Sequence, residues 1–188
     1  MDASDLVTLE LIKRVKYQYL RCLDQKRWRE LGDILTPDCV AAYSGGKYSY
    51  VGRDAILDFL RQTMGREAVL SSHRCTQPEI DITGPETASA VWALNDVVID
   101  LDYEITIRGA AFYTDDYVLQ DGRWLIARTA YKRTYEELQS RKDVRRLRLT
   151  ASWWGTDGRS DLEVAPRDRA PERAPTERAP GWDPTANL

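Results

Sequence analysis

Hydrophobic positions in the first third of the chain recur at the spacing of amphipathic helices. Apolar side chains three and four residues apart predict a first helix over residues 4–24, with its apolar face directed at a core. The same spacing predicts a short second helix over residues 28–35, which Thr36-Pro37-Asp38 ends. A third helix is predicted to start at Gly52 and to end at Met64-Gly65.

After residue 68 the pattern changes to that of strands. Segments rich in β-branched and aromatic residues are separated by turn signals such as Gly84-Pro85 and Asp121-Gly122. The predicted strands cover residues 69–75, 79–82, 87–100, 105–119 and 124–133, and a hairpin over residues 40–51 precedes them. Helices followed by long strands predict an α+β fold, in which the helices pack on one face of a strongly bent mixed or antiparallel sheet and enclose a pocket.

Composition changes sharply near residue 155. Five of the 8 prolines lie in the last 23 residues, within the near-repeat RAPERAPTERAP, whose charges alternate in sign. Such a segment buries too little apolar surface to offset its ordering entropy. We therefore predict a folded domain over residues 1–156 and an extended, disordered tail over residues 157–188.

The charge balance argues against two classes of partner. The chain carries 27 basic and 30 acidic residues, so it has no basic excess that would favour nucleic acid or anionic lipid. No run of 18 apolar residues occurs, and the first residues lack the order of a signal peptide. A soluble cytoplasmic protein that binds neither nucleic acid nor membrane is expected.

The side chains that usually hold cofactors are scarce. The 3 cysteines show no CxxC spacing, and one histidine excludes His-rich metal sites. Motifs for nucleotides, serine hydrolases and zincins are absent, so no metal or cofactor is expected. Aromatic residues are abundant by contrast, with 6 Trp and 10 Tyr, and such rings commonly line a binding site.

Three polar residues fall at unexpected places in the pattern. Asp96 lies on an otherwise apolar strand face, where a carboxylate needs a partner, water or a ligand cavity; Arg108 and Arg128 are the candidate salt-bridge partners. His73 lies in mid-strand and is the only side chain with an ordinary pKa near neutrality. Asp24 lies near the end of the first helix. As structural alternatives, His73 is a satisfied core or edge residue and Asp24 a solvated helix terminus.

Tyr19 lies one and a half turns before Asp24. The two residues are about 140° apart around a regular helix, so they face one cavity only if the helix ends or tightens near Leu23. A histidine, two carboxylates and tyrosines in one aromatic pocket would suit proton transfer at carbon.

Short motifs along residues 5–140 match one known family. They are Ile12-Lys13, Lys16-Tyr17-Gln18-Tyr19, Leu23-Asp24, Trp28-Arg29-Glu30-Leu31, Thr36-Pro37-Asp38, Gly52-Arg53-Asp54-Ala55-Ile56, Ser72-His73, Gly84, Thr87-Ala88, Asp121-Gly122-Arg123-Trp124 and Tyr131-Lys132-Arg133. In these the chain resembles the SnoaL-like proteins of the nuclear transport factor 2 superfamily. The resemblance implies a cone-shaped α+β barrel around a deep apolar pocket, and a homo-oligomer, either a trimer or a dimer.

The resemblance also implies a site. In the bile-acid dehydratase branch, and similarly in scytalone dehydratase and lindane dehydrochlorinase, an Asp at the end of the first helix pairs with a strand His; Asp24 and His73 match that pair. Tyr19 and Asp96 match a further Tyr and Asp of the bile-acid branch, and Arg133 corresponds to its basic residue near the last strand.

The resemblance favours a cofactor-independent dehydratase of a hydrophobic cyclic or polycyclic hydroxy-ketone. His73, oriented by Asp24, would remove a proton from carbon, and Tyr19 would donate to the enolate. A protonated Asp96 would assist the departing hydroxyl. Further substrate contacts are expected from Arg133, Tyr48, Tyr50, Trp92 and Tyr113. An isomerase, a polyketide or steroid cyclase, and a non-catalytic small-molecule binder remain alternatives.

Overall fold

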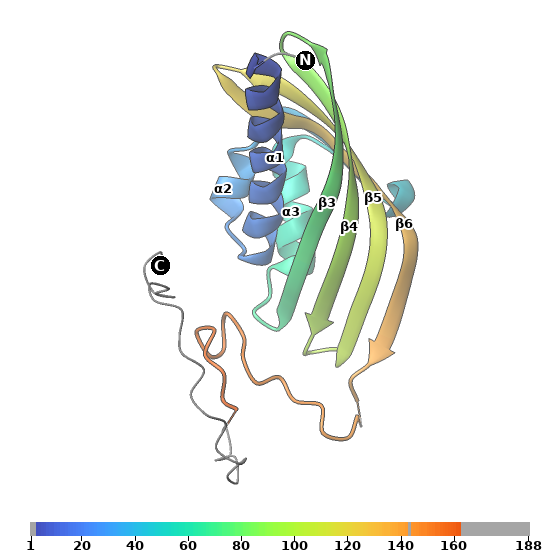
Figure 1. The fold of residues 1–188 in the computed structure, drawn as a ribbon. Coiled ribbons are helices and arrows are strands. Elements are labelled where there is room, and N and C mark those ends of the chain that lie inside the picture. Colours follow the sequence, from blue (N-terminus) through green and yellow to red (C-terminus); the bar gives the residue numbers. More distant parts are fainter. Residues whose placement is uncertain (1–2, 143, 163–188) are drawn as a thin grey trace, which may run out of the picture.

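Three helices and six strands make up the computed structural model, which describes residues 3–142 and 144–162 (Figure 1). The helices are α1 (Ala3–Asp24), α2 (Trp28–Gly32) and α3 (Arg53–Met64), and a 3-10 turn, η1, covers Ser44–Gly46. The strands are β1 (Leu35–Tyr43), β2 (Tyr48–Val51), β3 (Val69–Gly84), β4 (Thr87–Asp100), β5 (Ile105–Gln120) and β6 (Arg123–Ser140). The helices therefore come before the long strands, as the sequence predicts.

The strands form one mixed sheet in the order β2-β1-β6-β5-β4-β3. β1 runs parallel to β6, and the other neighbouring pairs are antiparallel. The sheet is long and strongly curved, and α1 and α3 lie against its concave side (Figure 1). This confirms the predicted α+β class with N-terminal helices. Over the described residues the sheet stays open, with β2 and β3 as its edges, so the helices rather than strand pairing complete the cone.

The second predicted helix is shorter than expected, because β1 begins early. α2 ends at Gly32, and Thr36-Pro37-Asp38 lies inside β1 instead of ending a helix. The register of β1 against β6 shifts between Leu35 and Val40. A proline, which cannot donate a ladder hydrogen bond, is accommodated at such an irregularity.

Two of the predicted strands form a single strand in the structure. Residues 69–75 and 79–82 both belong to β3, which is continuous but bulges between Thr76 and Glu79, where Gln77 has a positive φ of 51°. Residues 76–78, which lie between the two predicted segments, therefore form a bulge, which bends a strand without ending it. β6 in turn is longer than predicted and continues to Ser140.

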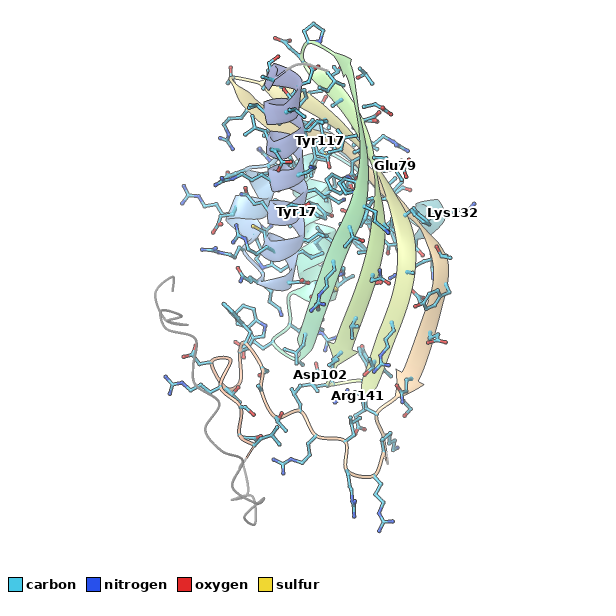
Figure 2. The ribbon with its side chains drawn as sticks, in the orientation of Figure 1. Tyr17, Glu79, Asp102, Tyr117, Lys132 and Arg141 are labelled. Atoms are coloured by element: carbon cyan, nitrogen blue, oxygen red, sulfur yellow. The ribbon has the colours of Figure 1, made fainter. Side chains whose placement is uncertain are left out.

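The hydrophobic core fills the space between the helices and the concave face. Ile12 of α1, Ile56 of α3, Trp92 of β4 and Ile126 of β6 have no exposed surface. In Figure 2, Tyr117 lies between the helices and the sheet. Because a fully buried aliphatic or aromatic side chain contributes roughly 1.5–3 kcal/mol, this layer fixes α1 and α3 against the strands.

The chain beyond β6 has neither helix nor strand in residues 141–142 and 144–162. It returns to the end of α1, where the ring of Trp154 lies 4.6 Å from Nζ of Lys26. Residues 163–188, most of the predicted tail, lie outside the described residues, so the division at residue 156 stays a prediction. Among the helices that the structure describes, none has the length and hydrophobicity needed to cross a bilayer.

Candidate active site

The end of α1 is tied to β3 by hydrogen bonds to Asp24. Nδ1 of His73 lies 2.6 Å from Oδ1 of Asp24, and the backbone N–H of His73 donates to Oδ2 at 2.9 Å. The hydroxyl of Ser71, two residues earlier on the same strand face, donates to Oδ1 at 2.7 Å. Three donors from one strand thus hold the carboxylate beside the His73 ring.

The helix ends here through a Schellman motif. Lys26 has a φ of 55°, its N–H bonds to the carbonyl of Leu23, and the N–H of Arg27 bonds to the carbonyl of Cys22. Asp24 is therefore in the last turn, and its side chain is directed at the edge of the sheet. Tyr19, one and a half turns earlier, faces the interior instead, so the two residues do not face one cavity and His73 lies between them.

The hydrogen bond between Asp24 and His73 determines which ring nitrogen of the neutral histidine carries the proton. Burial alone would raise the pKa of the Asp24 carboxyl, but hydrogen bonds from the His73 side chain and backbone and from Ser71 outweigh it, and the pKa lies below its ordinary value. An ionised carboxylate accepts a hydrogen bond, so Nδ1 carries the proton in the neutral ring. The opposite nitrogen, Nε2, is then unprotonated and able to act as a base.

His73 forms part of the wall of a cavity of about 380 Å³ between the helices and the sheet. The wall is mainly aromatic and aliphatic, and charged groups are few. The lining residues are Tyr19, Leu23, Tyr43, Ser44, Lys47, Tyr48, Phe59, Leu60, Thr63, Met64, Val69, His73, Val98, Asp100, Ile105, Ile107, Tyr113, Tyr131, Arg133 and Glu136. Such a lining suits an apolar ligand that a few polar groups orient.

Buried tyrosines form one side of this cavity. The hydroxyls of Tyr19 and Tyr43 are 2.8 Å apart, and the rings of Tyr113 and Tyr131 meet edge to face at 5.3 Å. Burial raises the pKa of both Tyr19 and Tyr113 well above the ordinary value. Their phenols are therefore neutral hydrogen-bond donors at any pH near neutrality.

Tyr43 and Tyr131 were missed by sequence reasoning, although the sequence contains a signal for both. Tyr43 continues the alternation of buried positions Cys39 and Ala41 in β1. Tyr131 lies two residues before Arg133 and shares its face of β6. Alternation from Arg133, a predicted substrate contact, would have identified Tyr131, and alternation from the apolar positions Cys39 and Ala41 would have placed Tyr43 on the buried face of β1.

Asp96 has a different partner from those that the sequence offered. Its carboxylate, on a residue only 4% exposed, accepts two hydrogen bonds from Arg133, from Nη1 at 2.5 Å and from Nη2 at 2.9 Å. Neither Arg108 nor Arg128 takes this place. Because a bidentate guanidinium pair favours a carboxylate acceptor, this arrangement does not support the predicted role of Asp96 as a protonated acid.

The other predicted contact residues divide into two groups. Arg133, Tyr48 and Tyr113 line the cavity. Tyr50 and Trp92 do not. The ring of Tyr50 stacks on Phe59 with centroids 4.6 Å apart, behind the cavity wall. Trp92 is fully buried in the core, where its ring meets the edge of Tyr17 at 6.1 Å.

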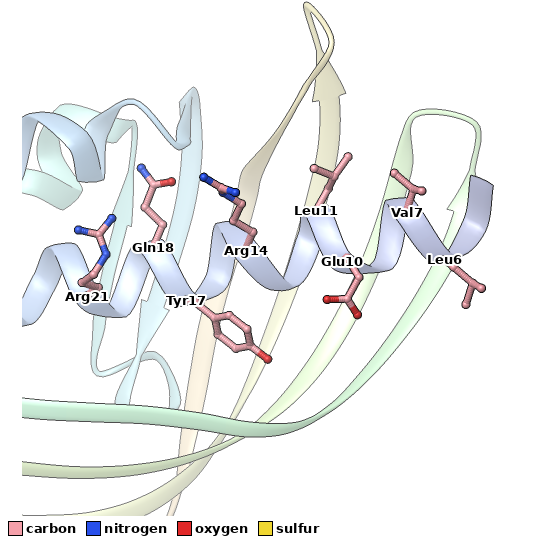
Figure 3. Close-up of a pocket in the computed structure, with 8 residues that line it drawn as sticks. All are labelled: Leu6, Val7, Glu10, Leu11, Arg14, Tyr17, Gln18 and Arg21. Carbon is pink, nitrogen blue, oxygen red and sulfur yellow. The ribbon is translucent and has the colours of Figure 1, made fainter. Parts of the chain in front are cut away.

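A larger hollow of about 760 Å³ lies along the outer side of α1 (Figure 3). Leu6, Val7, Leu11 and Tyr17 contribute its apolar part, and none of the predicted site residues lines it. The hollow has no histidine and no buried ion pair. Although it is larger, the cavity at His73 is therefore the candidate active site, because only that one combines a general base with buried polar groups. Nowhere in the described residues do three His, Cys, Asp or Glu side chains gather as metal ligands would.

Comparison with known proteins agrees with this fold. The family model for the SnoaL-like domain matches residues 5–130. An uncharacterised protein of Mycobacterium tuberculosis is 24% identical over 148 residues, which cover 73% of this chain and 97% of that protein.

Two solved structures share the architecture. A structure assigned to a scytalone dehydratase of Novosphingobium aromaticivorans has a TM-score of 0.68 and 23% identity, and the match covers 73% of this chain and 91% of that one. The type-3 hexachlorocyclohexane dehydrochlorinase of Novosphingobium barchaimii has a TM-score of 0.67 and 18% identity, covering 74% and 94%. At these identities the likeness shows the fold alone.

Proposed function

The chain belongs to the SnoaL-like domain family, and from its cavity we propose that it is a dehydratase acting on a hydrophobic cyclic or polycyclic hydroxy-ketone. The observation that carries the proposal is the 2.6 Å contact between Nδ1 of His73 and Oδ1 of Asp24 in the wall of an aromatic cavity. The two lyases among the structural neighbours support the reaction class by analogy.

The first step is removal of a proton next to the substrate carbonyl. Nε2 of His73 takes the proton, the electrons of the C–H bond form an enolate, and the imidazolium is stabilised by the Asp24 carboxylate. Proton transfer by a positioned base contributes typically about 10²–10⁴-fold to the rate.

The enolate oxygen needs donors that remain protonated. The phenols of Tyr19 and Tyr113 meet this condition because burial raises the pKa of each. Arg133 lies in the same wall, and although its guanidinium is bonded to Asp96, it keeps further N–H groups that can donate to the enolate oxygen. Donors oriented in advance inside a water-poor cavity are usually the largest source of rate enhancement.

In the second step the enolate returns its electrons to form the carbonyl and a carbon–carbon double bond. The bond between the neighbouring carbon and the hydroxyl oxygen breaks, and the leaving oxygen takes the proton from Nε2 of His73. Water and a conjugated ketone result, and His73 is neutral again. His73 thus takes the role of general acid that the sequence predicts for Asp96, because the oxygens of Asp96 already accept hydrogen bonds from Arg133.

The experiment is incubation of the protein with a panel of cyclic β-hydroxy-ketones of one to three rings. We expect absorbance of a conjugated ketone and a product lighter by one water in mass spectrometry. His73→Ala should lower turnover by about 10²–10⁴-fold, the usual contribution of a general base. Arg74→Ala should not, because Arg74 is the next residue on β3 and is exposed on the opposite face.

Two results would lead to other conclusions. A product whose mass is unchanged in ordinary water, and which gains deuterium when the reaction is run in heavy water, would identify an isomerase or cyclase that uses the same proton abstraction. Tight binding without turnover, unaffected by His73→Ala, would identify a non-catalytic binder and would contradict the proposal.

A further inference from the structure

The polar groups of the candidate site lie in one row across four strands. His73 of β3 pairs with Asp96 of β4, Asp96 with Gly109 of β5, and Gly109 with Glu136 of β6. Directly opposed residues of antiparallel strands point to the same face of the sheet. The row therefore runs along the concave face, and Gly109 is the only member of it without a side chain.

The space that Gly109 leaves empty is occupied by Arg133. A Cβ atom at Gly109 would lie 2.6 Å from Nη1 and 3.3 Å from Cζ of Arg133. The guanidinium thus lies directly on the backbone of β5 and crosses that strand to reach Asp96 on the far side. Any other residue type at position 109 would occupy this path.

The local backbone of β6 directs Arg133 into this path. The register between β5 and β6 shifts between Ala110, which pairs with Tyr135, and Ala111, which pairs with Arg133, so Thr134 is the extra residue of a bulge. The bulge places Arg133 and Glu136 on the same face, with Nε of Arg133 3.1 Å from Oε2 of Glu136. Bulges commonly direct side chains in this way beside active sites.

We propose that Gly109 is a positioning residue: its missing side chain forms a slot for the Arg133 guanidinium, and the slot holds that charge beside the enolate site. The inference rests on the proposed function in so far as Arg133 stabilises an oxyanion. The slot itself is a physical feature that can be measured without any substrate.

The substrate-free test uses guanidinium as a probe. Arg133→Ala empties the slot, and millimolar guanidinium chloride should then raise the melting temperature relative to equal sodium chloride. In Gly109→Ala/Arg133→Ala the new methyl group fills the slot, and that stabilisation should disappear. Equal stabilisation of both proteins would overturn the proposal, whether or not the protein is a dehydratase.

The kinetic test is a double-mutant cycle with the hydroxy-ketone panel. Gly109→Ala should lower kcat up to about a hundredfold, as expected for a misplaced catalytic group, with little change in KM. In an Arg133→Met background the same substitution should have almost no further effect. An equal loss in both backgrounds would show that Gly109 does not act through Arg133.

Two controls separate positioning from folding. Gly84→Ala alters another strand glycine, whose Cβ would lie 2.8 Å from Oγ1 of Thr87, a side-chain atom far from Arg133; it should leave the guanidinium response and kcat unchanged. A Cβ at Gly109 would also lie 2.9 Å from the carbonyl oxygen of Tyr135. If Gly109→Ala fails to fold both with and without the Arg133 side chain, the glycine is needed to avoid a clash with the Tyr135 carbonyl and not to make room for Arg133. The proposal is then wrong.

Discussion

Asp24 accepts two hydrogen bonds from His73, one from the backbone N–H at 2.9 Å and one at the ring nitrogen Nδ1 at 2.6 Å. The backbone bond does not depend on the imidazole. Substitutions at His73 therefore remove the ring without releasing the end of α1 from β3, which allows the chemistry of the ring to be tested separately from the fold.

His73→Ala should lose turnover and keep its ligand. We expect kcat to fall by about 10²–10⁴-fold, the usual contribution of a general base, while the dissociation constant of the product ketone changes little. Steady-state kinetics and calorimetric titration measure the two quantities. A variant that retains wild-type kcat would disprove the assignment of His73 as the base.

Asp24 should contribute to stability in a pH-dependent way. Its folded pKa is depressed, so the unfolded state binds the proton more readily; the contribution is present above the unfolded pKa of about 3.9 and is lost as the pH falls through the folded pKa. Urea unfolding of wild type and Asp24→Asn from pH 7 to pH 3 should show the difference between them shrinking below about pH 4.

Asp54 provides the control for this measurement, because 92% of its side chain is exposed. Asp54→Asn should follow the wild-type curve across the range. If Asp24→Asn did the same, the hydrogen bonds to Asp24 would contribute nothing to folding.

A second buried ion pair lies in the core outside the candidate site. Nζ of Lys16 is 2.7 Å from Oδ2 of Asp115, and neither side chain has exposed surface. Asp115 also accepts hydrogen bonds from Tyr117 at 2.9 Å and from Thr129 at 2.8 Å. Lys16→Met leaves this carboxylate buried without its cation and should cost about 3–5 kcal/mol of unfolding free energy.

Adding Asp115→Asn to Lys16→Met should recover part of that loss, since no uncompensated charge remains. Lys13→Met serves as the surface comparison, because Lys13 pairs with Glu10 on the exposed side of α1, and it should cost less than about 1 kcal/mol. Urea denaturation measures all three variants. A loss at Lys16 no larger than at Lys13 would contradict the buried pair.

The thiols should be unreactive in the folded protein. Burial raises the pKa of Cys39 to about 12 and that of Cys75 to about 11, and it raises the pKa of Cys22 as well. Since the thiolate is the reactive form, iodoacetamide at pH 8 should label these residues slowly in buffer and quickly in urea. Intact-mass measurement follows the labelling, and rapid modification of Cys75 in the native protein would disagree with the structure.

The sequence pattern predicts the local parts of this fold better than its long-range contacts. The spacing of hydrophobic residues and the turn signals place α1, α3 and the long strands. His73 stands out because it is the single histidine of the chain. Arg133 could not be matched to Asp96 in this way, because the two lie on strands that are not neighbours and meet only across Gly109. That contact depends on a bulge in β6, and hydrophobic periodicity carries no information about it.

The aromatic residues show the same limit. Trp92 and Tyr50 were expected in the cavity because of their residue type, yet position along a strand decides which rings reach it. Trp92 lies in the closed core and Tyr50 behind Phe59, whereas Tyr43 and Tyr131 line the cavity. Composition predicts an aromatic cavity, and the position of each ring along its strand decides whether that ring lines it.

The bulge in β3 has a consequence for how the protein avoids aggregation. β3 is an edge strand of 16 residues, and a long straight edge with unpaired backbone groups is a template on which a second chain can add a strand. The register break between Thr76 and Glu79, with Pro78 inside it, interrupts that template near its middle. The β3 edge of the sheet therefore offers no continuous row of unpaired backbone groups along its full length. This protects the molecule against edge-to-edge polymerisation.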